Sequence, residues 1–583
     1  TWHGTTQETR RKHKSMNEPH GGKLIDLMVS PEKAKTYKKD IQSLPRWTLT
    51  MRQACDFELL SNGGFSPLTG FMDEPTYLSV CKDMRLPGSN LVWPMPITLD
   101  VTAEFAKSLK PAQKVVLEDA EGVALGILTV KDIYKPDKKA EAEWVFKTTD
   151  TAHPGVNYLF NQAGEYYLGG DIEALALPHH YDFVDLRLTP KELRERFKKL
   201  GWQKIVAFQT RNPMHRAHVE LTLRACADNA MNLLINPTVG MTKPGDVDHY
   251  TRVRVYKHIL DKYPPSTATL SLLPLAMRMG GPREALWHSI IRKNYGATHF
   301  IIGRDHAGPG KDSNGNDIYG PYESQQLAEK YAPEIGVEIV PFQMMVYVPK
   351  LDRYKPVDEL AEGEEHQTLS GTELRALLNT GKELPSWFTY PEVAAELRRS
   401  YKPRKERGFV VFFTGLSGSG KSTLAKGLLS RLHETGGRTI TLLDGDEVRR
   451  HLSSELTFSK EHRDLNIKRI GYVAAEIAKH GGIAICAPIA PYESLRQEVR
   501  RMAESCGAGF IEVYVNTPLE VCEQRDRKGL YAAARAGKIK NFTGISDPYE
   551  PPKNPEFVAD TTTSTREELV QSILLAIENA GYL

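Results

Sequence analysis

Residues 409–446, FVVFFTGLSGSGKSTLAKGLLSRLHETGGRTITLLDGD, decide the fold of the C-terminal part of this 583-residue chain. An apolar run leads through a glycine-rich loop into a segment with helical spacing, and a second apolar run follows. Two further runs, IAICAPI and FIEVYVN, are separated by helix-like stretches. Strands that alternate with helices of this length are typical of a parallel sheet with crossover helices. The pattern predicts a doubly wound α/β domain over residues 408–583.

The glycine-rich loop fits the pattern G-x-x-x-x-G-K-[ST] between a predicted strand and a predicted helix. Its glycines allow backbone N–H groups to converge on phosphate oxygens at a helix N-terminus. Lys421 can reach the β- and γ-phosphates, and the Ser422 hydroxyl can ligate Mg²⁺. We interpret the loop as an ATP site, with a glycine-rich turn that binds nothing as the alternative. The predicted ATP-binding residues are Gly415, Leu416, Ser417, Gly418, Ser419, Gly420, Lys421, Ser422 and Thr423.

Two acids, Asp444 and Asp446, follow the next strand at the carboxyl edge of the sheet, where ligands bind. Such a carboxylate can hold Mg²⁺ or accept a proton from an attacking hydroxyl, although it can also simply cap the next helix. Arg449, Arg463 and Asn466 lie on the helical segments that follow. Arginines near a phosphate site suit an anionic substrate, whereas an isolated arginine is usually a solvated surface charge.

The domain resembles the adenylylsulfate (APS) kinases through GLSGSGKST, LDGD, FSKEHRDLNIKRI, PLEVCEQRDRKGLY and FTGISDPYEPP. The resemblance implies transfer of the ATP γ-phosphoryl group to the ribose 3′-hydroxyl of APS, giving PAPS and ADP. It implies Lys421 and Asp446 as catalytic residues, Ser422 and Asp446 at the metal, and a mobile lid over 525–545. Phe458 and Phe542 would stack on the substrate adenine, unless they are ordinary core residues. It assigns Arg525 to ATP, and to APS it assigns Asp446, Arg449, Phe458, Arg463, Asn466, Ile489, Lys528 and Phe542.

Two departures from that family concern the kinase chemistry. Ala490 stands where many members have serine, which argues for direct in-line transfer without a phosphoserine intermediate. Ala532 and Ala533 replace a pair of lysines, which could weaken contacts of the lid. The intact phosphate loop and Asp446 argue against a degenerate kinase domain.

The chain before residue 398 divides into three predicted parts. Residues 21–185 mix short apolar runs with Gly and Pro, and an antiparallel hairpin around DAEG indicates a β-rich domain. Residues 186–348 alternate KIVAFQT, MNLLINPTVG, TLSLLPLAM and THFIIGRDHA with helix-like stretches, which predicts a second parallel sheet. Residues 349–397 contain an N-capped helix, SGTELRALLNTG. The charged stretch 398–407 is interpreted as a linker or a frayed helix end, and residues 1–20 as an extension or an artificial addition.

The strand KIVAFQT is followed by the stretch QTRNPMHRAH, which opens a predicted helix. His215 and His218 are three residues apart and therefore share one helical face. Donors at a helix N-terminus can stabilise charge that develops on a polyphosphate. Zinc binding is a rival interpretation, although no glutamate lies between the histidines and no third ligand has suitable spacing. Two structural histidines are a further alternative.

These residues resemble the ATP sulfurylases through QTRNPMHRAH, AMRMGGPREALWHSIIRKNYG, FIIGRDHAGPG and SGTELR…WFTYPEV, over about residues 20–397. The resemblance implies a PUA-like N-terminal domain, a Rossmann-like nucleotidyltransferase domain, and attack of sulfate on the ATP α-phosphorus to give APS and diphosphate. Gln209, Arg211 and the Ala307 backbone would bind sulfate, and a structural role is equally open for Asp305. The implied catalytic residues are Arg211, Asn212, His215, His218 and Arg304. The implied ATP-binding residues are Gln209, Thr210, Arg211, Asn212, His215, His218, Gly303, Arg304, Asp305, His306 and Val346.

Composition excludes several classes of protein. The 76 basic and 73 acidic residues leave a formal charge of +3, which does not favour a nucleic-acid binder. Six scattered cysteines without metal-ligand spacing indicate free thiols in a reducing compartment. No apolar stretch approaches the length of a membrane span. We expect a cytoplasmic protein that uses Mg²⁺ with ATP, binds no membrane, and needs neither zinc nor haem.

Together the two resemblances predict a fusion enzyme of sulfate activation, with ATP, sulfate, diphosphate, APS and PAPS as ligands. A homo-oligomer, either dimer or hexamer, is expected from the family. Three alternatives stay open: a C-terminal domain that mainly senses PAPS or APS, a sulfurylase that works in reverse to make ATP from APS, and a nucleotide-binding scaffold without turnover.

Overall fold

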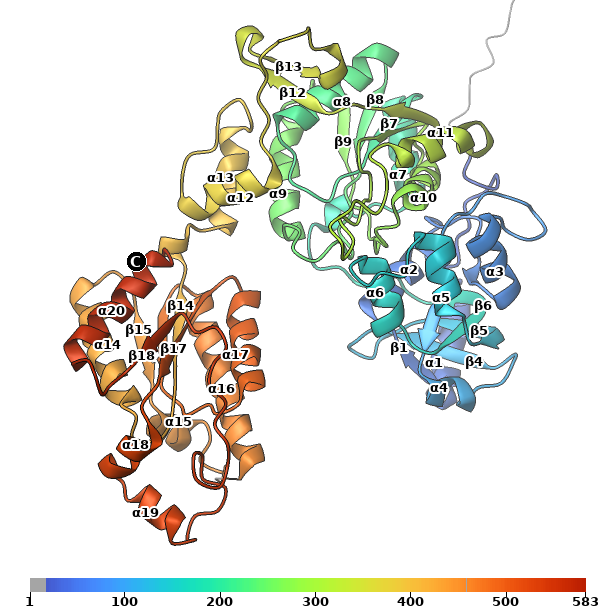
Figure 1. Cartoon of the computed structure of the whole chain (residues 1–583). Coiled ribbons are helices and arrows are strands. Elements are labelled where there is room, and N and C mark those ends of the chain that lie inside the picture. The colour runs from blue at the N-terminus through green and yellow to red at the C-terminus, as the bar shows by residue number, and fades with distance from the viewer. Residues whose placement is uncertain (1–16, 458) are drawn as a thin grey trace, which may run out of the picture. The chain divides into compact units, whose positions relative to one another are not determined.

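The computed structural model describes residues 17–457 and 459–583 (Figure 1). It contains two compact units. Residues up to 369 and residues 385–396 form the first unit, and residues 370–384 and 397–583 form the second. In the described part of the chain, no helix has both the length and the apolar character needed to cross a membrane.

The N-terminal domain is built on a six-stranded sheet in the order β1-β4-β5-β6-β2, with β3 paired to β6. The hairpin predicted around DAEG is present, because β4 and β5 pair antiparallel with Lys114 opposite Thr129. The strands are β1 (Arg46–Thr48), β2 (Gly70–Phe71), β3 (Leu99–Val101), β4 (Lys114–Glu118), β5 (Ala124–Tyr134) and β6 (Tyr166–Ala174). The helices are α1 (Pro31–Asp40), α2 (Met51–Ser61), α3 (Glu74–Asp83), α4 (Ala103–Ser108), α5 (Lys138–Glu141) and α6 (Pro154–Asn161).

A five-stranded parallel sheet in the order β11-β10-β7-β8-β9 forms the second domain of the first unit. The four predicted apolar runs supply β7 to β10, whereas β11 is an edge strand of mixed exposure that the apolar pattern did not indicate. The strands are β7 (Ile205–Phe208), β8 (Asn232–Ile235), β9 (Ala268–Leu270), β10 (His299–Ile302) and β11 (Glu338–Pro341). The helices are α7 (Pro190–Leu200), α8 (Arg216–Asn229), α9 (His249–Leu260), α10 (Gly281–Asn294) and α11 (Glu323–Ile335).

The segment that follows is shared between the two units. Strands β12 (Met345–Val348) and β13 (Arg353–Pro356) form an antiparallel hairpin in the first unit. The predicted N-capped helix is α12 (Gly371–Thr380), which has a capping box at Ser370 and ends at a left-handed Gly381. It belongs to the second unit, where Arg407 donates to the Asn379 side chain at 2.5 Å. The chain then returns to the first unit and re-enters the second within α13 (Pro391–Ser400).

The C-terminal domain has a parallel sheet in the order β15-β16-β14-β17-β18, as the doubly wound pattern predicted. Alternate residues of β14 pack on opposite faces: Phe409, Val411 and Phe413 against α14 and α20, and Val410 and Phe412 against α16 and α17. Figure 1 shows these helix pairs on the two sides of the sheet. The strands are β14 (Phe409–Thr414), β15 (Ile440–Leu443), β16 (Ile483–Cys486), β17 (Gly509–Val515) and β18 (Phe557–Ala559). The helices are α14 (Lys421–Thr435), α15 (Gly445–His451), α16 (Lys460–Lys479), α17 (Glu493–Ser505), α18 (Leu519–Arg525), α19 (Leu530–Arg535) and α20 (Arg566–Asn579).

Candidate active sites

The first site lies where two neighbouring strands of the central sheet end. β7 and β10 pair in parallel, with Phe208 opposite Ile301. The loops that follow them, 209–215 and 303–307, therefore leave the same edge of the sheet. In open α/β sheets this carboxyl edge is where ligands bind.

His215 and His218 stand at the start of α8, where His215 is buried and His218 is partly buried. The backbone N–H of His215 donates to His218 Nδ1 at 3.0 Å, so that a neutral His218 carries its proton on Nε2. The Nδ1 atom of His215 lies 3.0 Å from the Thr389 hydroxyl, and its ring packs on Phe388 at 4.3 Å between centroids. Burial lowers the pKa of His215 to about 3 and that of His218 to about 4. Both imidazoles are therefore neutral at physiological pH.

The residues between β7 and α8 form a braced turn. The Thr210 hydroxyl bonds to both the backbone N–H and the carbonyl of Asn212, each at 3.0 Å. The Asn212 carbonyl also accepts from the Tyr256 hydroxyl at 2.7 Å. Arg211 forms an ion pair with Asp246. The turn thus presents the guanidinium of Arg211, whose position is restrained by Asp246, and the exposed side chain of Asn212.

The second loop of this site has a constrained backbone. Asp305 and Ala307 adopt the left-handed conformation, at φ of 53° and 54°. Such strain in non-glycine residues is found preferentially at functional sites. Arg304 is half exposed, and its Nε lies 3.2 Å from an Asp305 carboxylate oxygen. The His306 ring is 2.9 Å from Nδ1 of buried His288, and burial lowers the pKa of His306 well below its usual value.

Of two further predicted residues, one lies in the second loop and the other lies on a neighbouring strand. Gly303 begins the second loop directly after β10. Val346 is fully buried in β12, which packs against α8. His215, His218, the 303–307 loop and Val346 therefore all belong to the first unit. Val346 lies on the strand that packs against α8, the helix that begins after His215.

The second site surrounds the phosphate loop of the C-terminal domain. Lys421 donates to the carbonyls of Gly415 and Leu416 at 2.9 and 2.7 Å. Burial lowers the pKa of Lys421 to about 8. Gly415 has a φ of 149°, and a Cβ there would lie 2.6 Å from the Val515 carbonyl, so that only glycine fits this position. Ser422 and its neighbour Thr423 are exposed at the start of α14.

Side chains from distant segments support the phosphate loop. The hydroxyls of Thr517 and Thr561 donate to the Ser419 carbonyl at 2.9 and 3.1 Å. Arg525 donates to the Thr561 hydroxyl at 2.9 Å. Tyr531 donates to the Ser417 carbonyl at 2.8 Å. Arg525 is therefore connected to the loop through Thr561, and Tyr531 contacts the loop from the predicted lid.

The predicted APS residues lie on several elements. Arg463 donates to Asp547 at 2.6 Å and to the Thr543 hydroxyl at 3.0 Å. Asn466 is buried, and its side-chain oxygen has no hydrogen-bond partner within the described residues. The Ile489 carbonyl accepts from the Thr414 hydroxyl at 2.8 Å, beside the phosphate loop.

The remaining predictions of this site have separate outcomes. The Phe542 ring meets Tyr531 edge-on at 5.0 Å between centroids. Arg449 donates to the Leu456 carbonyl at 3.3 Å, and Lys528 is exposed. Phe458 and the side chain of Asp446 lie outside the described part, although the backbone of Asp446 belongs to α15.

Several contacting residues were missed by sequence reasoning. Thr389, Asp246, Asp547 and Thr561 hold predicted site residues but lie far from them in the chain. Nothing in their local sequence spacing identifies them. Thr389 and Asp547 lie within two of the family motifs, WFTYPEV and FTGISDPYEPP, but the motifs gave neither residue a role.

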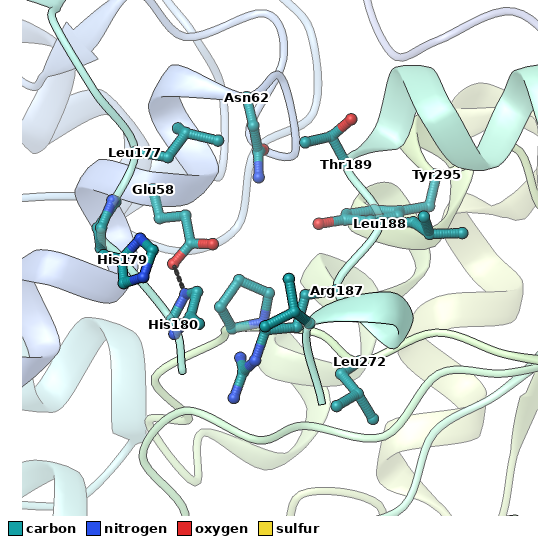
Figure 2. A pocket seen from close by; sticks show the side chains of 13 residues that line it. Glu58, Asn62, Leu177, His179, His180, Arg187, Leu188, Thr189, Leu272 and Tyr295 are labelled. Atoms are coloured by element: carbon teal, nitrogen blue, oxygen red, sulfur yellow. Dashed lines mark hydrogen bonds and ion pairs between the residues drawn. The ribbon is translucent and has the colours of Figure 1, made fainter. Parts of the chain in front are cut away.

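A separate cavity of about 260 Å³ lies between the N-terminal domain and the central domain (Figure 2). Its walls include Glu58 of α2 and Asn62, which follows the end of that helix, and Glu58 pairs with His180 at 2.8 Å. None of the predicted site residues lines it. Elsewhere in the described chain, no group of three or more His, Cys, Asp or Glu side chains is placed to hold a metal ion. All six cysteines are free thiols.

The fold and sites define a class of protein in which a PUA-like domain and a nucleotidyltransferase are fused to a phosphate-loop kinase. Family models agree with this order: PUA-like domain over 17–177, ATP-sulfurylase over 184–400 and adenylylsulphate kinase over 407–560. The chain belongs to the sulfate adenylyltransferase family, and it is an enzyme with both sulfurylase and APS kinase domains.

Relatives along the whole chain support this assignment. A sulfate adenylyltransferase of Chaetomium globosum is 54% identical, and one of Neurospora crassa is 53% identical, each over 97% of this chain and 99% of the relative. Among solved structures, a hexameric APS kinase from Thiobacillus denitrificans matches with a TM-score of 0.80 and 39% identity. That match covers 98% of this chain and 100% of the solved chain.

Proposed function

We propose that this chain carries out both steps of sulfate activation. The first domain pair joins sulfate to the ATP α-phosphorus and releases diphosphate. The C-terminal domain then transfers the γ-phosphoryl group of a second ATP to APS, giving PAPS and ADP. The observation that carries the proposal is the presence of two donor-rich loops, 209–218 and 415–422, at the carboxyl edges of two separate parallel sheets.

In the sulfurylase step, Gln209, Arg211 and the Ala307 backbone bind sulfate. Asn212, His215, His218 and Arg304 stabilise the ATP phosphates as diphosphate leaves. Neutral imidazoles suit this role, because a neutral ring can present an N–H donor without the cost of burying a charge, as His218 does through Nε2. Alignment and electrostatic stabilisation are sufficient for such a displacement, so no covalent nucleophile is required.

In the kinase step, Lys421 leaves the loop carbonyls and contacts the phosphates of ATP. Arg463 and Asn466 bind APS, together with Arg449, and Phe542 packs on its adenine. Ala490 carries no hydroxyl that could be phosphorylated, which favours direct in-line transfer.

We propose Mg²⁺ as the cofactor of both steps, carried by ATP. The chemistry of the donors fits this ion, since the Ser422 hydroxyl and the Asp446 carboxyl are hard oxygen ligands. Mg²⁺ supplies charge neutralisation on the phosphates, and the chain positions the reacting groups around it.

The fusion has a thermodynamic advantage. APS contains a mixed anhydride of higher energy than the bond broken in ATP, so the first equilibrium lies toward ATP. A kinase that consumes APS draws the reaction forward. The physiological direction of the sulfurylase is thus proposed to be APS formation rather than ATP formation.

The test is conversion of ³⁵S-sulfate by the full chain with MgATP and pyrophosphatase, with separation of APS from PAPS. Label in PAPS would support both steps. Lys421→Met is the control, and in this variant label should stop at APS. Absence of sulfate-dependent diphosphate release in the wild type would overturn the sulfurylase proposal.

A second candidate function is a C-terminal domain that senses PAPS or APS without turning over. The observation that favours it is the lid helix α19, which carries Ala532 and Ala533 in place of charged residues. Label that stops at APS in the wild type, with sigmoidal inhibition of the sulfurylase by PAPS, would support this candidate.

We also propose a cytoplasmic homo-oligomer, either a dimer or a hexamer. The solved relative described as hexameric and the free cysteines support this proposal. Light scattering coupled to size-exclusion chromatography measures the assembly directly, and a monomer would contradict it.

A further inference from the structure

Arg292 is a fully buried cation beneath the first active site. It lies on α10, and its Nη2 donates to Gln209 Oε1 at 3.2 Å and to the Asn236 carbonyl at 2.9 Å. Its Nε and Nη1 atoms have no hydrogen-bond partner among the residues that the structure describes. A buried charge without a counter-ion is costly, which makes this residue unusual.

Among the residues that the structure describes, no acidic side chain forms an ion pair with Arg292, and Glu284 acts on its charge only from a distance. His288 and His306 are neutral, because burial lowers the pKa of each well below its usual value. The carboxylate of Glu284 lies two turns earlier on the same helix and accepts from the backbone N–H groups of Arg278 and Gly280, at 3.1 and 2.7 Å. Burial lowers the pKa of Arg292 to about 9, so it remains charged at neutral pH.

Arg292 also determines how Gln209 is oriented. A guanidinium group can only donate hydrogen bonds, so the Gln209 atom that faces it must be the amide oxygen. The Thr238 hydroxyl donates to the same oxygen at 3.1 Å. The Gln209 nitrogen is left with Met277 Sδ at 3.9 Å, a weak acceptor. Its N–H groups are thus available to a stronger acceptor at the edge of the sheet.

We propose that Arg292 is a positioning residue of the oxyanion site: it holds the Gln209 amide so that its N–H groups face the anion, and its own charge is compensated when a tetrahedral dianion binds. The inference rests on the proposed function for the identity of the dianion, which is sulfate. It goes beyond that function because Arg292 stabilises the bound dianion through its charge without contacting the substrate.

Three variants of the full chain test this inference. In Arg292→Met the KM for sulfate should rise about tenfold or more, while the KM for ATP changes less than about threefold. Its thermal midpoint without sulfate should equal or exceed that of the wild type, because an unpaired buried charge is removed. In Gln209→Glu the new carboxylate pairs with Arg292, so the midpoint should rise and the response to sulfate should disappear. Thr238→Val should give a smaller increase in the KM for sulfate than Arg292→Met.

The matched control is Arg278→Met, which removes a buried arginine that does have a counter-ion, Asp56. Its midpoint should fall. Thermal midpoints are followed by tryptophan fluorescence, with sodium sulfate compared against sodium chloride at equal ionic strength.

The outcomes separate the inference from the proposed function. Wild type without sulfate-dependent diphosphate release would contradict the proposed function, whatever the variants do. Active wild type with an unchanged sulfate KM in Arg292→Met would overturn the inference. If Arg292→Met does not fold, Gln209→Glu decides: a raised midpoint supports the inference, and a midpoint equal to or below that of the wild type overturns it.

Discussion

His215 Nδ1 lies 3.0 Å from the hydroxyl of Thr389, a residue 174 positions later in the chain. The contact connects the first turn of α8 to the segment 385–396 within the first unit. It leaves His215 Nε2 as the ring nitrogen that can face a ligand. The later segment therefore orients a group on which the proposed adenylyl transfer depends.

Thr389→Val should lower the kcat/KM of the sulfurylase about tenfold, corresponding to ~1.4 kcal/mol, because a buried ring nitrogen loses its partner. Thr389→Ser keeps the hydroxyl and should restore most of the activity. Sulfate-dependent diphosphate release measures both variants. Equal activity of Thr389→Val and wild type would show that the contact has no role in orienting His215.

The first unit should lose stability below about pH 6.5. The pKa values of His215 and His218 are depressed in the folded state, to about 3 and about 4, from an unfolded value near 6.5. Between these values the unfolded chain binds more protons, so stability is fully present above pH 6.5 and falls as the pH decreases. Each histidine should contribute a loss on the order of 1 kcal/mol at pH 5.5.

Urea unfolding followed by tryptophan fluorescence measures this effect in the first unit, because all seven tryptophans precede residue 388. The double variant His215→Asn, His218→Gln should show a weaker pH dependence between pH 5 and 6.5. An identical slope in wild type and variant would contradict the assignment.

Asp547→Asn should weaken APS binding in the kinase. The Asp547 carboxylate holds Arg463 at 2.6 Å and accepts from the Tyr492 hydroxyl at 2.8 Å. Loss of its charge should free Arg463 and raise the KM for APS about tenfold, with a smaller effect on the KM for ATP. Tyr492→Phe, which removes only a donor to the same carboxylate, should have a smaller effect. Unchanged APS kinetics in both variants would rule out a role for Asp547 in positioning Arg463.

Asp56→Ala should strongly destabilise the first unit. Asp56 pairs with Arg278, and both side chains are 1% exposed. Removing one partner leaves a buried uncompensated charge, and the expected loss is about 3–5 kcal/mol of unfolding free energy. The double variant Asp56→Ala, Arg278→Met should recover most of the loss. A double variant that is no more stable than Asp56→Ala would indicate that the charge is compensated elsewhere.

Much of the fold could be predicted from local patterns. Apolar runs followed by helical spacing identified β7 to β10 and the strands β14 to β17, because buried parallel strands are nearly continuous hydrophobic sequences. The edge strand β11 has mixed exposure and therefore no such pattern. The grouping of α12 with the second unit depends on contacts such as that of Arg407 with Asn379, which no periodicity encodes.

In the two sites, too, some features follow from local sequence motifs and others depend on contacts between distant residues. Motifs located the phosphate loop and the histidine turn, since their chemistry requires fixed spacing. The residues that hold these side chains in place come from distant parts of the chain. Thr389 contacts His215, and Asp547 pairs with Arg463. Arg292 lies within one of the family motifs, but what distinguishes it from an ordinary helical arginine is its burial, with two guanidinium nitrogens that have no partner in the described part of the chain.

The chain passes between its two units at residues 369, 384 and 396. These crossings affect how the gene can be divided into two halves that are expressed separately. A single break in the charged stretch 398–407 would leave α12 on the fragment that lacks Arg407. A kinase expressed alone from residue 408 would lose that helix entirely. Recombinant halves intended to behave as the parent enzyme therefore require the segment 370–384 to be grafted onto the C-terminal piece rather than left behind.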